Sequence, residues 1–292
     1  MKRLALAGVA LLVACLATGS TAVASGGTKV SVPTEQGKPL VTPKKGVCKS
    51  HYTLTEFAAA GKEGSEGESA LSAEERALLK DVLPHIKYLG SGVGGMPTIQ
   101  FSGVNVQIVN GEGKTASANG EGNLVIGYDE AAEAEQTGSH DLILGEQQTY
   151  TSYGGILAGS GNAITDPFAS VSGGRGNIAE GEYASVSGGF GNTASGREAS
   201  VSGGGRNTAS DTEASVSGGF NNLANSIGAS VSGGSGNTAS AAAASVSGGS
   251  RNNASGEAAS VSGGENNTAS GEAASIFGGT GLEASAPFDA KP

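Results

Sequence analysis

Tryptophan is absent from the chain, and large side chains of any kind are few. Aromatic residues make up 4% of the 292 positions, whereas glycine alone occupies 51 of them. An ordinary compact core requires more large apolar side chains than this composition supplies. The apolar fraction of 37% is mostly alanine and valine. The composition therefore predicts either disorder or a repeat that buries small residues in a thin core.

Positive charge is also scarce. The chain has 17 lysines and arginines against 27 acidic residues, which gives a formal net charge of −10. Nucleic acids and anionic lipid surfaces are bound through clusters of lysine and arginine. We therefore expect no nucleic-acid partner. We also expect no transmembrane domain, because the longest apolar run is too short to cross a bilayer.

The first apolar run is typical of a signal peptide over residues 1–24. It follows a positively charged start and ends at Ala22-Val23-Ala24, a small-x-small cleavage site. We predict a secreted, extracellular protein. A second interpretation is a lipoprotein signal, because residues 12–15 (LVAC) fit a lipobox and would attach the chain to the cell surface through Cys15. After plain secretion Cys48 would remain alone, which suggests a free thiol or an intermolecular bridge.

Two segments of different character follow the signal. Residues 25–70 are polar and rich in proline and lysine, so we expect a flexible leader, and glycine at every third position over 61–69 has the spacing of a collagen triple helix. A short helical neck is predicted over 71–90, because Ser72-Ala73-Glu74-Glu75 is a capping box and Pro84 should end or kink the helix. The a/d spacing of its apolar residues leaves two options open, a weak coiled coil or an amphipathic helix packed on the next domain.

The apolar pattern changes to strand-like alternation farther along the chain. Apolar and polar residues alternate from Ile99 to Ile108, and similar short apolar runs lie at 123–130 and 141–148. These runs predict a β cap and first coils over 97–168. Their larger residues are expected to close one end of a stack.

A 15-residue repeat fills residues 169–288, and residues 289–292 form a tail. Its units begin at Ala169, Ala184, Ala199, Ala214, Ala229, Ala244, Ala259 and Ala274. Each unit contains two alternating pieces, typically ASVS and NTAS, separated by glycine-rich corners. A fixed short period of this kind indicates a solenoid. We predict an all-β fold, a parallel β-roll or β-solenoid of 15-residue coils, preceded by a short helix.

The alternation places one valine (or isoleucine) and one asparagine of each unit inside the coil. The expected repeat core consists of Val171, Val186, Val201, Val216, Val231, Val246, Val261 and Ile276, together with Asn177, Asn192, Asn207, Asn222, Asn237, Asn252 and Asn267. Stacked amides can hydrogen-bond from coil to coil. We therefore interpret these asparagines as structural, without a ligand.

The core of each coil is thin. One valine, two alanines and an asparagine provide little stabilisation against the conformational entropy of fifteen ordered residues. Burying one face against neighbouring chains would add to it. Because the Gly-x-x triplets and the helical neck both suggest three chains, we expect a homotrimer.

The unit SVSGGxxNTASGxx resembles the head repeat SVAIGxxAxASGxx of trimeric autotransporter adhesins, the YadA-like family, over roughly residues 120–286. The resemblance implies a left-handed parallel β-roll, a trimer, an extracellular location and adhesion to host or matrix surfaces. The repeat here is mostly one residue longer than in that family. The chain also ends in GLEASAPFDAKP, without the family's membrane-anchor strands. We therefore expect a secreted or lipid-anchored, adhesin-like head protein whose ligand the matching positions do not identify.

No catalytic constellation is evident, so we expect no enzyme activity, no cofactor and no metal site. His51, His85 and His140 have no other ligand-type residues at metal-binding spacing. The segment GEGKT (111–115) lacks the first glycine of a phosphate loop. The repeated SGGxGN carries asparagine where a calcium-binding repeat needs carboxylates.

An ice-binding β-solenoid is the alternative function. Outward T-x-S pairs on stacked coils would form a flat hydroxyl array that resembles the threonine faces of antifreeze solenoids. The candidate ice-binding residues are Thr193, Ser195, Thr208, Ser210, Thr238, Ser240, Thr268 and Ser270. In three of the seven coils, other residues replace the T-x-S pair at these positions. This interruption favours the adhesin-like interpretation.

Overall fold

A computed structural model describes residues 28–33, 52–57, 71–130 and 135–292. The chain divides into two compact units, Met1–Val104 and Asn105–Pro292. The predicted signal peptide, the lipobox, both cysteines, the Gly-x-x triplets and His51 lie outside the described residues.

The described residues of the first unit form two strand pairs and one α-helix. Strands β1 (Thr28–Pro33) and β2 (Tyr52–Phe57) pair in antiparallel fashion, although both belong to the segment that we expected to be a flexible leader. Strands β3 (Ile86–Leu89) and β4 (Thr98–Phe101) form a second antiparallel pair. Helix α2 (Ala73–Val82) precedes β3.

The helix begins as the sequence predicts and ends earlier than the predicted neck. The Ser72 side chain accepts a hydrogen bond from the Glu75 N–H, and the Glu75 carboxylate accepts one from the Ser72 N–H, which completes the capping box. A 3-10 turn, η1 (Leu83–His85), contains Pro84 and stops the helix. The remaining apolar neck residues belong to β3, so they do not continue a helical heptad.

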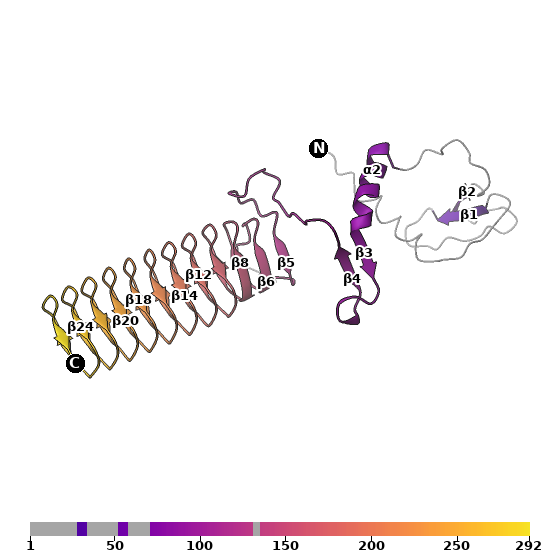
Figure 1. Cartoon of the computed structure of the whole chain (residues 1–292). Coiled ribbons are helices and arrows are strands. Elements are labelled where there is room, and N and C mark those ends of the chain that lie inside the picture. The colour runs from indigo at the N-terminus through magenta and orange to yellow at the C-terminus, as the bar shows by residue number, and fades with distance from the viewer. Residues whose placement is uncertain (1–27, 34–51, 58–70, 131–134) are drawn as a thin grey trace. The chain divides into compact units, whose positions relative to one another are not determined.

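The second unit is a parallel β-solenoid, as predicted, and its coils stack along one axis (Figure 1). One sheet has 12 strands: β5 (Leu124–Ile126), β6 (Leu142–Glu146), β8 (Ile156–Ser160), β10 (Ser170–Val171), β12 (Ser185–Val186), β14 (Ser200–Val201), β16 (Ser215–Val216), β18 (Ser230–Val231), β20 (Ser245–Val246), β22 (Ser260–Val261), β24 (Ser275–Ile276) and β26 (Ala290–Lys291). The opposite sheet has 10 strands: β7 (Thr149–Tyr150), β9 (Ala163–Ile164), β11 (Ile178–Ala179), β13 (Thr193–Ala194), β15 (Thr208–Ala209), β17 (Leu223–Ala224), β19 (Thr238–Ala239), β21 (Asn253–Ala254), β23 (Thr268–Ala269) and β25 (Glu283–Ala284). We call them the first and the second sheet.

The fifteenth residue of each coil lies just after the strand of the first sheet. Strands β6 and β8 pair over five residues with a register step of 14. Val171 still pairs with Leu157, also 14 residues away, but Arg175 bridges to Ser160, which is 15 residues away. One residue is therefore inserted between Val171 and Arg175, and the later strands of this sheet shorten to two residues.

The core is a column of small side chains enclosed by one chain. Two alanines of each regular coil have no exposed surface, such as Ala199, which precedes β14, and Ala209 in β15. Larger residues fill the first coils, including Ile143 and Leu157. The end strand β5 differs from our expectation of a closed cap, because its three residues are 43–58% exposed. The alternating pattern from Ile99 to Ile108 predicted a strand, but the strand ends at Phe101, and residues 102–123 contain none.

Candidate functional surfaces

The repeat-core residues named from the sequence all lie inside the solenoid. Every valine of the set, and Ile276, is at most 1% exposed, as is every asparagine. Their side chains are therefore unavailable to a ligand. Any function of the repeat must lie on the outward side chains of the two sheets and on the corners between them.

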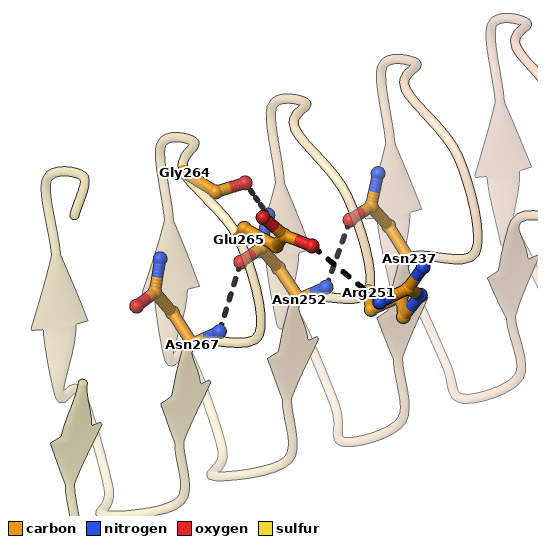
Figure 2. Close-up of polar contacts among 6 residues, drawn as sticks. All are labelled: Asn237, Arg251, Asn252, Gly264, Glu265 and Asn267. Carbon is orange, nitrogen blue, oxygen red and sulfur yellow. Dashed lines mark hydrogen bonds and ion pairs between the residues drawn. The ribbon is translucent and has the colours of Figure 1, made fainter. Parts of the chain in front are cut away.

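The asparagines form a continuous ladder that runs through the backbone (Figure 2). The side-chain oxygen of Asn237 accepts a hydrogen bond from the Asn252 N–H at 2.9 Å, and Asn252 does the same for Asn267 at 3.0 Å. The Asn252 amide NH₂ donates to the carbonyls of Gly248 and Gly264, at 2.9 and 3.0 Å. Each side-chain amide thus satisfies backbone groups of its own coil and of the following coil, which explains its burial.

The ladder has a distinct residue at each end. The Asn162 N–H donates to the Gln148 side-chain oxygen, and the Gln148 N–H donates to the Asp129 carboxylate, each at 3.0 Å. Burial raises the pKa of Asp129, against the effect of the hydrogen bond from Gln148. At the other end the Leu282 N–H donates to Asn267, and leucine has no amide to continue the ladder. The repeat pattern identified the asparagines and their replacement by Leu282, but not Gln148 and Asp129 at the start of the ladder.

The outward side of the first sheet carries two ranks of serine, which we call the serine face. In the half-buried rank, serine pairs with serine in register from β10 to β24. It consists of Ser170, Ser185, Ser200, Ser215, Ser230, Ser245, Ser260 and Ser275. The second rank is exposed and consists of Ser172, Ser187, Ser202, Ser217, Ser232, Ser247 and Ser262. In every unit, the segment from the first alanine to the second glycine, typically ASVSGG, contains no charged residue.

Apolar side chains lie at both ends of the serine face. In the rank that includes Ser170, the preceding coils carry Leu124, Leu142 and Ile156. Leu124 and Ile156 are each 45% exposed. At the far end Phe277 takes the place of the exposed serine and is itself 65% exposed. The face is therefore uncharged along its length, with apolar surface at its ends.

The candidate ice-binding residues lie on the outward side of the second sheet, where all eight are half-buried or exposed. Their threonine rank is interrupted. Thr193 pairs with Thr208, but the next coil carries Leu223, and Asn253 separates Thr238 from Thr268. The rank forms no continuous hydroxyl lattice, so the ice-binding alternative gains no support from this geometry.

The described residues form no cluster of metal-ligating side chains. Among them, no three or more histidine, cysteine, aspartate or glutamate side chains are placed to hold a metal ion. His85 contacts the Ser102 carbonyl, and His140 contacts the Thr115 carbonyl and the Asn110 N–H. The GEGKT segment lines an open hollow beside His140 and is not followed by a helix. In the same part of the chain, no helix has the length and apolar character to cross a membrane.

Asp141 is an unusual buried carboxylate at the start of the solenoid. It is 2% exposed, and one carboxylate oxygen accepts the Gly155 N–H at 2.7 Å, while the other has no hydrogen-bond partner. Burial raises the pKa of Asp141 to about 6, against the opposing effects of the Gly155 N–H and of His140.

We expect Asp141→Asn to stabilise the protein at pH 8 and to have little effect at pH 4. The folded state holds the proton more tightly than the unfolded chain, so this carboxyl favours folding below its ordinary pKa of 3.8. That contribution is lost as the pH rises through about 6. The gain at pH 8 is at most about 3 kcal/mol. Thermal denaturation followed by circular dichroism at both pH values tests this, with Asp166→Asn, at an exposed carboxylate, as the charge control. A gain independent of pH would contradict it.

A comparison with protein-family models and with curated proteins finds no match to this chain. The sequence resemblance and the geometry of the described surfaces therefore carry the functional argument.

Proposed function

We propose that the protein is a secreted or surface-attached, adhesin-like head protein that assembles as a homotrimer and has no enzymatic role. The serine face is the surface by which the copies contact one another. The remaining outward positions bind the target surface. This assignment agrees with the sequence resemblance to the heads of trimeric adhesins.

The observation that carries the proposal is the constancy of the serine face. The buried valine and asparagine explain why the inward positions repeat, but the stability of one coil places no such demand on the two outward serines. The outward threonine rank of the second sheet shows this freedom, because it also accepts isoleucine, leucine, asparagine and glutamate. We therefore infer that a contact outside the coil, rather than the stability of the coil itself, keeps the residues of the serine face constant.

A second copy of the same chain meets that requirement. Its serine ranks have the same spacing, so two faces of small side chains can approach closely over many coils. Contact between copies would also remove the exposed Leu124, Ile156 and Phe277 from water. Acidic residues such as Glu198 and Glu213 lie at the corner that precedes the strands of this face, and they are not part of its serine ranks.

The oligomeric state tests the proposal. We expect the mature chain to have three times its own mass by light scattering after gel filtration. Ser217→Glu places a charge in the exposed rank of the serine face and should reduce the mass to that of one chain. Ser210→Glu adds the same charge to an exposed position of the second sheet and should leave the trimer intact.

A folded monomer of the unaltered protein would overturn the trimer. Equal effects of the two glutamate variants would overturn the assignment to the serine face. Binding of the trimer to immobilised matrix and to cells, compared with that of the Ser217→Glu form, tests adhesion directly. No binding by an intact trimer to any such surface would contradict the adhesive role.

A further inference from the structure

The four arginines of the solenoid fall into two classes. Arg197 forms ion pairs with Glu198 at 2.7 Å and Glu182 at 3.6 Å, and Arg251 pairs with Glu265 at 3.4 Å. Neither of the other two, Arg175 and Arg206, takes part in an ion pair among the residues that the structure describes.

The two unpaired arginines lie over phenylalanine rings. Arg197 also lies over a ring, that of Tyr183 at 5.9 Å, but its guanidinium is held by its ion pairs as well. The Arg175 guanidinium is 5.1 Å from the ring centre of Phe190, and that of Arg206 is 5.8 Å from the ring centre of Phe220. The rings are 45% and 50% exposed. Such stacking orients a guanidinium and leaves its N–H groups free for an acceptor.

These four residues form a line along one edge of the solenoid. Arg175, Phe190, Gly205 and Phe220 bridge to one another in successive coils, and Arg206 follows Gly205 directly. We call Arg175, Phe190, Arg206 and Phe220 the arginine–phenylalanine strip. The arginines belong to coils two steps apart, roughly 10 Å along the axis.

The strip has no acidic side chain within its own corners, although the chain carries a net charge of −10. The corner segments at 172–176, 187–191, 202–206 and 217–221 contain no aspartate or glutamate. The acidic residues of these coils lie instead around the opposite corner, as at Glu182, Glu198 and Glu213. The same edge carries Glu146 two coils before Arg175 and Glu265 three coils after Phe220. Between these two positions, the positive charge next to the exposed aromatic rings has no acidic side chain beside it.

The geometry points to an acidic polysaccharide as the ligand of this strip. Its charged groups recur at intervals of about a disaccharide, which suits two arginines two coils apart, and the CH faces of its sugar rings suit the exposed phenylalanines. A nucleic acid duplex carries a charge about every 1.7 Å and needs far more positive charge than two arginines supply. This inference rests on the proposed adhesive function, for which it names the target chemistry.

The test compares Arg175→Gln/Arg206→Gln with Arg197→Gln/Arg251→Gln, two double variants that remove the same charge. Binding of the full mature protein to immobilised heparin (sulfated) and hyaluronan (carboxylated) is measured by biolayer interferometry, with dextran as the neutral control. We expect binding to at least one acidic polymer, weakened by salt, and none to dextran. Arg175→Gln/Arg206→Gln should lower the affinity at least tenfold, and Phe190→Ala/Phe220→Ala should also lower it.

Arg197→Gln/Arg251→Gln, which removes the ion-paired arginines, should change the affinity less than twofold. Equal losses in the two arginine variants would show nonspecific attraction and overturn the strip. Binding of neither polymer would overturn the inference. Equally strong binding of double-stranded DNA or of phosphatidylserine vesicles would overturn the assignment to an acidic polysaccharide and indicate another class of ligand. Each variant's melting temperature and trimer mass are measured alongside, so a failure of this inference is distinguishable from a failure of the proposed head function.

Discussion

Gly219→Ala is expected to destabilise the solenoid by about 3 kcal/mol or more, although it adds a single methyl group. Gly219 has φ of 86°, where an L-residue is strained. A Cβ on this residue would overlap the carbonyl oxygen of Gly234 and the side-chain amide of Asn222. Both neighbours are fixed by the stacking of the coils, so neither can move away without breaking the ladder.

The preceding glycine is the matched control. A Cβ on Gly218 would meet no atom within 4 Å, and its φ is not in the left-handed region. Gly218→Ala should therefore change the free energy of unfolding by no more than about 0.5 kcal/mol. Urea denaturation of both variants measures the difference. Similar values for the two variants would mean that the coil relaxes around the methyl group.

The repeated part of the fold could be predicted from the sequence because every unit repeats the same order of inward residues, outward residues and corners. The inward alternation of Val201 with small residues, and the recurrence of asparagine every 15 residues, define which side chains face inside. The Gly-Gly pair of each unit marks one corner, because its second glycine, such as Gly204 or Gly219, adopts the left-handed backbone conformation. The identity of each inward residue thus follows from period and alternation alone.

The opposite corner could not be predicted in the same way. Its left-handed position is held by Glu198 and Glu213 in some coils and by alanines such as Ala258 in others, with φ of 55–59°. Neither residue type favours this conformation. Hydrogen bonds between coils, such as that from the Ala258 N–H to the Ala242 carbonyl at 2.9 Å, impose it. Only the stacked structure shows this requirement.

Pairing between distant segments was also beyond the sequence pattern. Ile86 and Leu89 have helical spacing after Leu79 and Val82, yet they pair with the strand that ends at Phe101. Pro84 ends the helix before Ile86. Two strands that pair across a connecting loop produce no periodic pattern in the sequence that would reveal the pairing. Similarly, the strip from Arg175 to Phe220 depends on which arginines have an acidic partner in their own or a neighbouring coil, and composition does not reveal this.

Asn222→Ala is expected to destabilise the protein by about 3–5 kcal/mol, because it leaves several buried groups without partners. The Asn222 oxygen accepts the Asn237 N–H at 2.9 Å, and its NH₂ donates to the carbonyls of Gly218 and Gly234 at 2.9 and 3.0 Å. Alanine replaces none of these bonds. In a stack where each coil contacts only its neighbours, the loss also weakens the coupling between the two halves.

Asn225→Ala and Asn222→Asp separate this effect from a general loss of asparagine. Asn225 is exposed, so its replacement should change the free energy of unfolding by no more than about 0.5 kcal/mol. Asn222→Asp keeps the shape, but a charged oxygen then faces the two glycine carbonyls. The aspartate is tolerated only when protonated, which raises its pKa in the folded state, so this variant should regain stability as the pH falls. Urea denaturation at pH 4 and pH 8 measures the recovery. An aspartate variant equally unstable at both values would mean that packing, rather than the hydrogen-bond ladder, requires the asparagine.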